Sequence, residues 1–582
     1  MIKRLAPYVA QYKKHAIFAP ILLIGEVLMD TLIPFIIAKL IDQGIQAQNM
    51  SAIWKYGGQM VLCAFFSLFC GVMSSRLSAI ATTGFAANVR QAIFHKIQTY
   101  SFANIDKFST ASLVTRTTTD VNNVQMAFMQ ILRVATRTPA MMIMSIVMCV
   151  IISPSLSVIF LVALIVLAAV LPVLVTVSGR RFSEVFKRYD RINNTVEENI
   201  AGARVVKAFV REDFESKKYD DATDDLRRHF IRAERITALN MPGMTLVINC
   251  CTIALSWFGA HHVMSHTLTT GQLTSMFSYV TQILMSMMML SMIFVMMSMS
   301  AASARRIIEV LDEVPDIASP EDPVTEVANG DIDFDNVTFR YSEESPDPVL
   351  SNITLHIHSG ETIGLIGGTG SGKSTLISLI SRLYDVSDGV VRVGDVPVKD
   401  YDVEVLRNSV SVVLQKNVLF SGTILSNLRW GDPDATEEQC REACRLACAD
   451  EFIDKLPDGF NSKVEQGGAN FSGGQKQRLC IARALLKKPK VLILDDSTSA
   501  VDTATDARIR KAFREVIPET TKIIIAQRIA SVQDADRIIV LDDGRLSGFG
   551  SHEELMNTNK IYQEIYETQT QGGGDFDEPE AD

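Results

Sequence analysis

The sequence predicts two domains of different fold class: an α-helical membrane domain with six transmembrane helices and long cytosolic extensions, followed by an α/β domain. The first observation is length, because 582 residues are too many for one hydrophobic core. The second is composition: 47% of the residues are hydrophobic and the mean hydropathy is positive, which is high for a soluble protein of this size. The third is a change of pattern near residue 310, where long uncharged runs give way to short strand-like and helical segments.

Charge and cysteine content argue against two other classes of protein. The formal net charge of -10 disfavours a nucleic-acid-binding protein, so no nucleic-acid partner is expected. The nine cysteines are scattered, with no CxxC pair and no framework spacing. They fit a reducing cytosolic environment better than a disulfide scaffold.

Residues 1–310 contain six apolar stretches, each close to the ~20 residues that cross a hydrocarbon core as a helix. The first follows a basic N-terminus but has no small-residue cleavage site after it, so we interpret it as a retained span and not as a signal peptide. Ser153-Pro154-Ser155 separates the third stretch from the fourth and predicts a turn. The predicted spans are 16–38, 56–75, 138–153, 157–178, 240–260 and 273–299.

Basic residues predict the orientation of these spans. They precede the first span and fill two long segments, 76–137 and 179–235, whereas Lys55 is the one lysine of the short connections. The positive-inside rule then places the N-terminus and both long segments in the cytosol. Because these segments lack Gly and Pro clusters, we expect helices that extend the spans and turn at a distant tip.

The second domain is predicted to cover 331–568. A linker, 311–330, punctuated by Pro, Asp and Gly, precedes it. Its first segment, DIDFDNVTFRY, alternates like a strand, and later segments alternate strand-like and helical patterns, the order of an α/β domain. The Gly-rich and acidic tail, 569–582, is expected to be disordered.

The segment GGTGSGKST fits the P-loop pattern GxxxxGK[ST] and lies between an apolar strand and an apolar helix. Its small residues allow backbone N–H groups to surround phosphates, while Lys373 reaches the terminal phosphates and Ser374 holds Mg²⁺. The predicted phosphate-binding residues are Gly367, Gly368, Thr369, Gly370, Ser371, Gly372, Lys373, Ser374 and Thr375.

Two adjacent carboxylates follow the apolar run VLIL, which fits a buried parallel strand. Asp495 is the candidate metal ligand, because a carboxylate at the end of such a strand can hold the Mg²⁺ of a nucleotide. Asp496 would then face the γ-phosphate, where a carboxylate can orient or deprotonate the attacking water.

A second predicted anion site is the segment SGGQ at the start of an apolar-periodic helix. Ser472, Gly473, Gly474 and Gln475 offer a hydroxyl and exposed N–H groups at a helix N-terminus. Two phosphate-binding devices in one domain suggest that two copies of the domain share nucleotides across an interface.

With these motifs the chain resembles one half of a type IV ATP-binding cassette (ABC) exporter, which has six membrane helices followed by a nucleotide-binding domain. The resemblance makes NFSGGQ the signature motif, VLILDD the Walker B motif and ATP with Mg²⁺ the cofactors. It also implies that Tyr341 stacks on adenine, that Gln415 contacts Mg²⁺, and that Asp502 ends a catalytic loop, SAVD. A multi-pass protein of the cell membrane with a cytoplasmic nucleotide-binding domain is expected.

The resemblance extends to the two cytosolic tips of the membrane domain, near 109–120 and 199–206. In the family the first tip docks mainly on the ATPase domain of its own chain and the second on that of the partner. Two halves pair, so that each ATP lies between the P-loop of one chain and the signature of the other. The expected cargo is an amphipathic small molecule or a lipid.

The chain departs from the family pattern at two positions. Asp496 stands where glutamate is usual, and Gln527 stands where histidine is usual. Shortening the side chain withdraws the carboxylate by roughly 1 Å, a misplacement that can cost on the order of 10²-fold in rate. Gln527 cannot become a cation near the γ-phosphate.

With an intact signature, this pattern resembles the degenerate-site subunit of a bacterial heterodimeric multidrug exporter. The partner would supply the missing glutamate and histidine in its own site. The alternatives are a slow homodimeric flippase or exporter and an ATP-gated regulatory membrane protein.

Some features of the sequence have more than one interpretation. Glu26 and Asp30, one turn apart in the first span, fit either cationic substrate or proton chemistry, or a structural role. The methionine-rich segment 285–300 fits either an adaptable substrate wall or ordinary packing. Three cysteines four residues apart, Cys440, Cys444 and Cys448, favour a packed helix face over a metal site, and His261 and His262 favour a polar extracellular turn.

Overall fold

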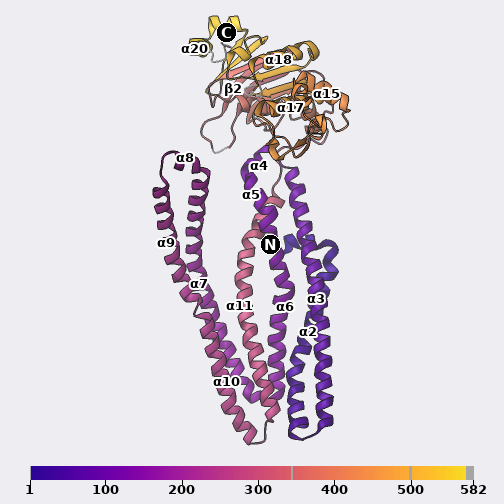
Figure 1. Cartoon of the computed structure of the whole chain (residues 1–582), viewed down its shortest axis with the longest axis vertical. Coiled ribbons are helices and arrows are strands. Elements are labelled where there is room, and N and C mark those ends of the chain that lie inside the picture. Colours follow the sequence, from indigo (N-terminus) through magenta and orange to yellow (C-terminus); the bar gives the residue numbers. More distant parts are fainter. Residues whose placement is uncertain (1, 343–344, 497–500, 572–582) are drawn as a thin grey trace. The chain divides into compact units, whose positions relative to one another are not determined.

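The computed structural model describes residues 2–342, 345–496 and 501–571 and divides the chain into two compact units (Figure 1). The helical unit comprises Met1–Gln98 and Ser109–Glu313. The α/β unit comprises Thr99–Phe108 and Val314–Asp582. Most of the predicted tail and part of the SAVD segment lie outside the described residues, and each unit is described by itself.

Long helices build the helical unit, and each predicted span lies in a different one. Pro154 starts the fourth long helix, where its missing N–H costs no hydrogen bond, so the predicted turn falls at Ser153. The helices of this unit are α1 (Ile2–Leu5), α2 (Lys13–Lys39), α3 (Met50–Gln98), α5 (Thr110–Thr115), α6 (Val121–Ile152), α7 (Pro154–Ala201), α8 (Ala203–Ala208), α9 (Glu212–Thr237), α10 (Asn240–Met264) and α11 (Thr270–Asp312).

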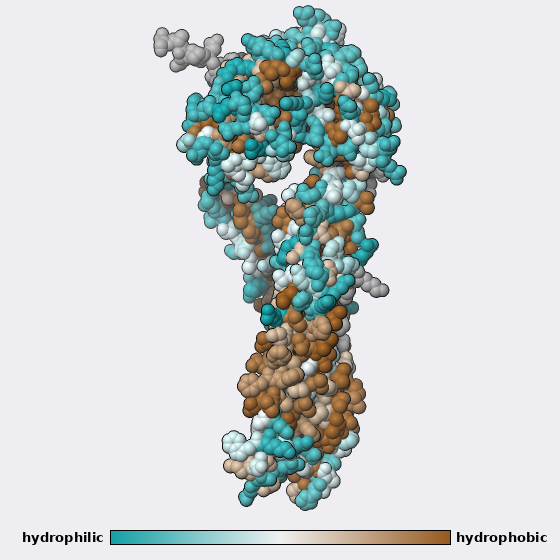
Figure 2. Space-filling model, turned by 90° about the vertical axis from the view of Figure 1, so that its right-hand side faces the viewer, coloured by the Kyte–Doolittle hydropathy of each residue, from teal (hydrophilic) through white to brown (hydrophobic). Residues whose placement is uncertain are grey.

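Figure 2 shows a band of apolar side chains on one face of these helices, with hydrophilic surface above and below it. Within the described residues, five stretches are long and apolar enough to cross a membrane. The fourth predicted span contributes a shorter apolar stretch, Pro154–Val170, at the start of α7. The apolar character of the unit is therefore confirmed, whereas six crossings remain a prediction.

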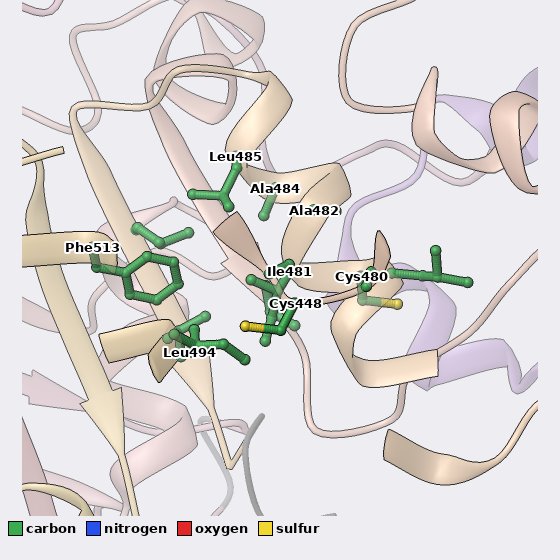
Figure 3. Packing of buried hydrophobic residues seen from close by; sticks show 14 of the residues in the cluster. Cys448, Cys480, Ile481, Ala482, Ala484, Leu485, Leu494 and Phe513 are labelled. Carbon is green, nitrogen blue, oxygen red and sulfur yellow. The ribbon is translucent and has the colours of Figure 1, made fainter. Parts of the chain in front are cut away.

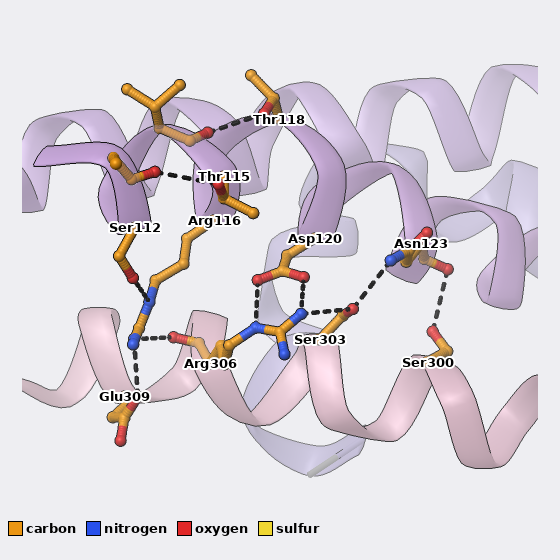
Figure 4. Close-up of polar contacts among 12 residues, drawn as sticks. Ser112, Thr115, Arg116, Thr118, Asp120, Asn123, Ser300, Ser303, Arg306 and Glu309 are labelled. Atoms are coloured by element: carbon orange, nitrogen blue, oxygen red, sulfur yellow. Dashed lines mark hydrogen bonds and ion pairs between the residues drawn. The ribbon is translucent and has the colours of Figure 1, made fainter. Parts of the chain in front are cut away.

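Both long polar segments are helical, as expected. In the second one, α7 and α9 run side by side and the short helix α8 forms the turn between them (Figure 1). In the first one, the short π-helix Arg116–Asp120, which leads into α6, is joined to α11 by ion pairs (Figure 4). The Arg306 guanidinium donates to the fully buried Asp120 carboxylate at 2.7 Å, and Arg116 donates to Glu309 at 2.7 Å.

The two acids of the first span are paired with a single arginine. The Arg137 guanidinium on α6 contacts Glu26 and Asp30 on α2, each at 2.9 Å. Asp30 also accepts a hydrogen bond from the Ser67 hydroxyl on α3 at 2.7 Å. Because charges at membrane depth are costly unless they are paired, these contacts favour the structural interpretation of Glu26 and Asp30.

Within the described part of the α/β unit, six strands form one sheet in the order β12-β11-β3-β10-β9-β6. The pairs from β11 to β6 are parallel, and β12 is antiparallel. A second, antiparallel sheet has the order β2-β1-β4-β5, and β7 pairs with β8. The strands are β1 (Ile332–Phe339), β2 (Leu350–Ile357), β3 (Thr362–Gly367), β4 (Asp388–Val393), β5 (Val396–Pro397), β6 (Val410–Val413), β7 (Gly422–Thr423), β8 (Lys463–Val464), β9 (Val491–Asp495), β10 (Thr521–Ile525), β11 (Arg537–Asp542) and β12 (Arg545–Gly550).

Helices cover the parallel sheet, so its strands are buried on both faces. Alternate residues of β9 divide between the two hydrophobic cores: Val491 and Ile493 join one, and Leu492 and Leu494 join the other. The helices of this unit are α4 (Phe102–Phe108), α12 (Lys373–Ile380), α13 (Val403–Ser409), α14 (Ile424–Leu428), α15 (Glu437–Leu446), α16 (Asp450–Ile453), α17 (Gly473–Leu486), α18 (Thr503–Val516), α19 (His552–Thr558) and α20 (Lys560–Gln571).

The three cysteines singled out in the sequence belong to the core that contains Leu492 and Leu494, and Figure 3 labels Cys448 within it. Cys440 and Cys444 lie on α15, and burial raises the pKa of both thiols. Cys448 is also buried, but α15 ends at Leu446, so the single continuous helix expected for the three thiols is wrong. The positive φ of Cys448, 51°, marks the turn after the helix. His261 and His262 lie in the last turn of α10 and not in a loop.

Residues at both ends of the α/β unit are more structured than expected. Val324 in the predicted linker pairs with Tyr401, and Ile317 and Val327 are buried. The predicted tail begins at Gln569, but α20 continues to Gln571. The Pro, Gly and acidic residues that predicted a linker and a tail therefore did not reveal the contacts that these segments make.

Candidate nucleotide site

Three neighbouring parallel strands bring the predicted site residues together. β10 lies between β3 and β9, so the carboxyl ends of all three strands meet at one edge of the sheet. The P-loop follows β3, Asp496 follows β9 and Gln527 follows β10. Ligands of open α/β sheets bind at such an edge.

The P-loop has a backbone that requires glycine. Gly372 precedes α12 with a φ of 91°, and a Cβ atom there would lie 2.7 Å from Leu350 Cδ2. A Cβ atom on Gly367 would lie 2.2 Å from the carbonyl oxygen of Leu541. No such obstruction surrounds Gly368 or Gly370, whose Cβ positions are open to space within 4 Å. The loop is thus packed against β11 and β2 at its ends and is accessible in its middle.

Lys373 points back into this loop. Its ammonium group donates to the carbonyl oxygens of Gly367 at 2.8 Å and Gly368 at 2.7 Å. Burial lowers the pKa of Lys373, although the charges of Asp495 and Asp496 oppose that shift. A positive charge inside a loop of small residues at the start of a helix is suited to bind phosphate groups.

Ser374 and Asp495 form a pair of oxygen ligands beside the loop. The Ser374 hydroxyl donates to Asp495 Oδ1 at 3.2 Å. Burial, reinforced by the neighbouring charge of Asp496, raises the pKa of Asp495 despite this hydrogen bond and the charge of Lys373. A hydroxyl and a carboxylate are ligands that Mg²⁺ prefers, so the residues present fit a Mg²⁺–nucleotide complex.

Asp496 and Gln527, the two departures from the family pattern, contact each other. The Gln527 side-chain amide donates to Asp496 Oδ2 at 2.9 Å. The backbone of Asp496 has a φ of 48°, and its carbonyl oxygen accepts a hydrogen bond from Gln477 Nε2 at 3.1 Å. Gln477, which is buried on α17, was not identified from the sequence, although a glutamine inside a largely apolar helix is a possible signal.

Tyr341 lies beside the P-loop helix with its ring half-exposed. Its hydroxyl and Thr375 Oγ1 are 2.9 Å apart, and its ring meets that of Tyr384 edge-on with 5.2 Å between the centroids. The Tyr384 hydroxyl donates to Asp106 on α4 at 2.6 Å, and burial together with this contact raises the pKa of Tyr384. The exposed ring of Tyr341 can stack on a nucleotide base.

α4 belongs to the α/β unit because of these contacts and lies just before the predicted tip 109–120, whose residues pair with α11 instead. Tyr384 was not identified from the sequence, because nothing in its local pattern indicates which segment it contacts.

The remaining predicted residues lie away from these contacts. Ser472 and Gln475 form a capping box at the start of α17, in which Ser472 is exposed. Gln415 is exposed in the loop after β6, and no hydrogen bond among the described residues joins its side chain to Ser374 or Asp495. Asp502 caps α18 by accepting from the Thr505 N–H at 2.9 Å, and that bond lowers the pKa of Asp502.

The sequence also matches two known domain families. Residues 16–287 match the ABC transporter transmembrane region, and residues 350–499 match the ABC transporter domain. The chain is 34% identical over 562 residues to the uncharacterized ABC transporter ATP-binding protein YfiB of Bacillus subtilis (strain 168), with 97% of each chain covered. The chain belongs to the ABC transporter family.

Two further comparisons support this assignment. The uncharacterized ABC transporter ATP-binding protein Rv1273c of Mycobacterium tuberculosis (strain ATCC 25618 / H37Rv) is 33% identical over 582 residues, with 98% of each chain covered. The structure of a bacterial Atm1-family ABC exporter with ATP bound has the same fold, with a TM-score of 0.81 and 23% identity over 98% of this chain and 100% of that one. The chain is accordingly a multi-pass membrane protein with a cytoplasmic ATP-binding domain.

Proposed function

We propose that this chain is one half of an ATP-driven exporter and that its own ATP site binds nucleotide but hydrolyses it slowly. The hydrogen bond between Gln527 and Asp496 carries this proposal. This bond supports the proposal because a neutral amide lies against the carboxylate that would have to activate water. Two alternatives, a slow homodimer and an ATP-gated regulatory protein, remain open and are separated by the experiments below.

The binding half of the proposed mechanism uses the P-loop, Tyr341 and Asp495. Tyr341 would stack on adenine, loop N–H groups and Lys373 would hold the phosphates, and Ser374, Asp495 and Gln415 would hold Mg²⁺. When bound, Mg²⁺ would neutralise charge on the β- and γ-phosphates. Two contacts support this half of the proposal: Lys373 donates to the Gly367 carbonyl oxygen inside the P-loop, and Ser374 donates to Asp495.

The catalytic half is weak for two physical reasons. The Asp496 side chain is one methylene shorter than glutamate, and its Oδ2 atom already accepts a hydrogen bond from Gln527. Gln527 can orient a phosphate oxygen through its N–H groups but cannot carry a positive charge toward the transition state. Each loss removes transition-state stabilisation while leaving ground-state binding intact.

The signature residues support a second chain in the assembly. Ser472 and Gly473 are exposed at the start of α17, which is a helix N-terminus with accessible N–H groups. We propose that they complete the ATP site of a non-identical partner that has glutamate and histidine in place of Asp496 and Gln527. Asp502 at the start of α18 would then position the loop that faces this interface.

The transported molecule is proposed to be an amphipathic small molecule or a lipid. Six crossings per chain, organised as residues 1–310 ahead of a nucleotide-binding domain at 331–568, would form the path together with the partner. The apolar band of the helical unit supports exchange with membrane lipids (Figure 2). The ion pairs of Arg137 with Glu26 and Asp30 join α6 to α2 and support a structural role for these two acids.

The first test compares the chain alone with the chain co-expressed with the product of its neighbouring gene, in lipid nanodiscs. Little ATPase activity is expected alone and full activity with the partner. Full activity of the isolated chain would instead support a homodimer with competent sites. ATP-dependent uphill flux into vesicles would exclude a channel, whereas downhill flux without hydrolysis would support one.

The second test restores the missing groups with Asp496→Glu and Gln527→His together. We expect the hydrolysis rate of this chain's own site to rise about 10- to 100-fold. The matched control is Asp458→Glu, which lengthens an exposed acidic side chain of the same domain that lies outside the motifs of the ATP site. An unchanged rate in the double variant would show that another feature limits the site.

A further inference from the structure

The loop that carries Gln527 is held from outside the nucleotide site by the last turn of α20. The Gln569 side chain spans this loop: its Nε2 donates to the carbonyl oxygen of Gln527, and its Oε1 accepts from the N–H of Ile529, each at 2.8 Å. One carboxamide therefore satisfies two backbone groups two residues apart. A two-point contact of this kind restrains both the position and the direction of the peptide between them.

Buried side chains hold α20 against the core of the α/β unit and so fix the position of Gln569. Tyr562 is fully buried, and its hydroxyl and His552 Nδ1 are 2.7 Å apart. Ile565 and Tyr566 pack against the hydrophobic core that also contains Ile529. Because residues three and four apart share one face of a helix, Gln569 lies one turn beyond Ile565 and Tyr566 on that face.

Among the described residues, the other backbone hydrogen bonds that join this loop to a different helix or strand lie at its ends, and the buried side chain of Ile529 packs in the core. At the start, the Ala526 N–H donates to the Leu365 carbonyl oxygen at 3.3 Å, and at the far end Arg510 donates to the Ser531 carbonyl oxygen at 3.1 Å. Gln569 contacts the stretch between them, which includes the residue that reaches Asp496. The contacts therefore run from α20 through the backbone of Gln527 to the Asp496 carboxylate.

We infer that Gln569 is a positioning residue for the ATP site, which sets the backbone from which residue 527 reaches Asp496 and the γ-phosphate. The inference rests on the role proposed above for the Asp496–Gln527 pair. Both hydrogen bonds of the Gln569 side chain are to backbone groups of the loop, so Gln569 acts through the loop. Movement of α20 would accordingly change the ATP site without any change in the P-loop.

The first experiment measures amide hydrogen exchange in the full chain in nanodiscs. Gln569→Ala removes both contacts, so exchange in 526–532 should accelerate about fivefold to tenfold while exchange in β3 and α12 stays unchanged. Gln563→Ala is the matched control, because Gln563 is on the same helix and bonds to the Met556 carbonyl oxygen instead. Unchanged exchange in 526–532 with Gln569→Ala would overturn the inference.

The second experiment measures ATP hydrolysis in the Asp496→Glu, Gln527→His background, where the backbone oxygen of residue 527 is still present. Adding Gln569→Ala should lower kcat about fivefold and leave KM for Mg²⁺–ATP unchanged, whereas adding Gln563→Ala should alter neither. Gln569→Glu keeps the acceptor for Ile529 but removes the donor to residue 527, and it should lower kcat to a similar extent. Equal kcat in all these variants would show that Gln569 does not position the loop for hydrolysis.

The two experiments distinguish failure of the proposed function from failure of the positioning role of Gln569. If the restored background gains no hydrolysis, the proposed cause of the slow site is wrong, while the exchange experiment still decides whether Gln569 holds the loop. If the background gains activity and Gln569→Ala has no effect on kcat, the proposed function stands and the positioning role is wrong.

Discussion

The two sides of the nucleotide site are built on adjacent strands but differ in their chemistry. On the binding side, Lys373 lies inside the P-loop and Ser374 contacts the buried Asp495. On the opposite side, a short carboxylate, Asp496, is joined to a neutral amide, Gln527. The same sheet edge thus carries the residues proposed to bind phosphate and the pair proposed to hydrolyse ATP slowly.

Under the proposed function, this difference makes nucleotide binding and nucleotide hydrolysis separable within one fold. The strand ends fix where the groups lie, while single side-chain atoms decide whether a proton can be moved or a charge stabilised. Substitutions on the two sides should therefore differ greatly in their effects. The predictions below run from the largest expected effect to the smallest.

The largest effect is expected from Lys373→Ala, on the binding side. The substitution removes a positive charge that two loop carbonyls hold in place and that the phosphates would share. ATP affinity should fall on the order of 10²-fold, since hydrogen bonds to charged groups contribute about 1.5–3 kcal/mol each. Equilibrium binding of a fluorescent ATP analogue to the chain in nanodiscs measures this loss. Retention of wild-type affinity would mean that phosphates bind elsewhere.

Asp495→Asn should have two smaller effects: it should stabilise the fold and weaken Mg²⁺-dependent ATP binding. Burial and the charge of Asp496 raise the pKa of Asp495, so its ionised form is disfavoured in the folded protein and costs stability above that pKa. Asparagine removes this cost, and the apparent Tm in EDTA should rise by about 1–3 °C. Mg²⁺-dependent ATP binding should weaken about tenfold, because a carboxylate ligand is lost.

The same shift predicts a pH dependence. Since the pKa of Asp495 is raised, protonation begins at a higher pH than for an ordinary aspartate, about 3.9. The Mg²⁺-dependent part of ATP binding should therefore decline as the pH falls, beginning above the range of an ordinary aspartate. Asp495→Asn should abolish that part of the pH profile, and a profile identical in both proteins would show that another group titrates.

The smallest effect is expected from Asp496→Asn, on the hydrolytic side. In an ATPase whose catalytic carboxylate is competent, this change costs several orders of magnitude, but here the carboxylate is already short and engaged with Gln527. The hydrolysis rate of this chain's own site should change by less than about threefold, and ATP affinity should not fall. A loss of 10²-fold or more in single-turnover measurements would show that Asp496 is an active base.

Local motifs located the candidate binding residues, because the P-loop, the Walker B strand and the signature each lie in one contiguous stretch. Spacing alone located Lys373, Ser374 and Asp495, and the structure brings them together. Two of the residues that sequence reasoning missed, Tyr384 and Gln569, act through contacts with segments far away in the chain. No periodicity or motif links a tyrosine to residue 106 or a glutamine to residue 527.

The sequence by itself determined the family of this protein, the apolar helical and α/β halves, and the two unusual side chains of the ATP site. These depend on residue type and short-range spacing, which hydrophobic burial and backbone sterics translate directly into local structure. Only the tertiary structure decided that Asp496 and Gln527 bond to each other, that Arg137 pairs with Glu26 and Asp30, and that α20 holds the loop after β10. Those contacts depend on strand order and helix packing, and both arise when distant segments bury their surfaces together.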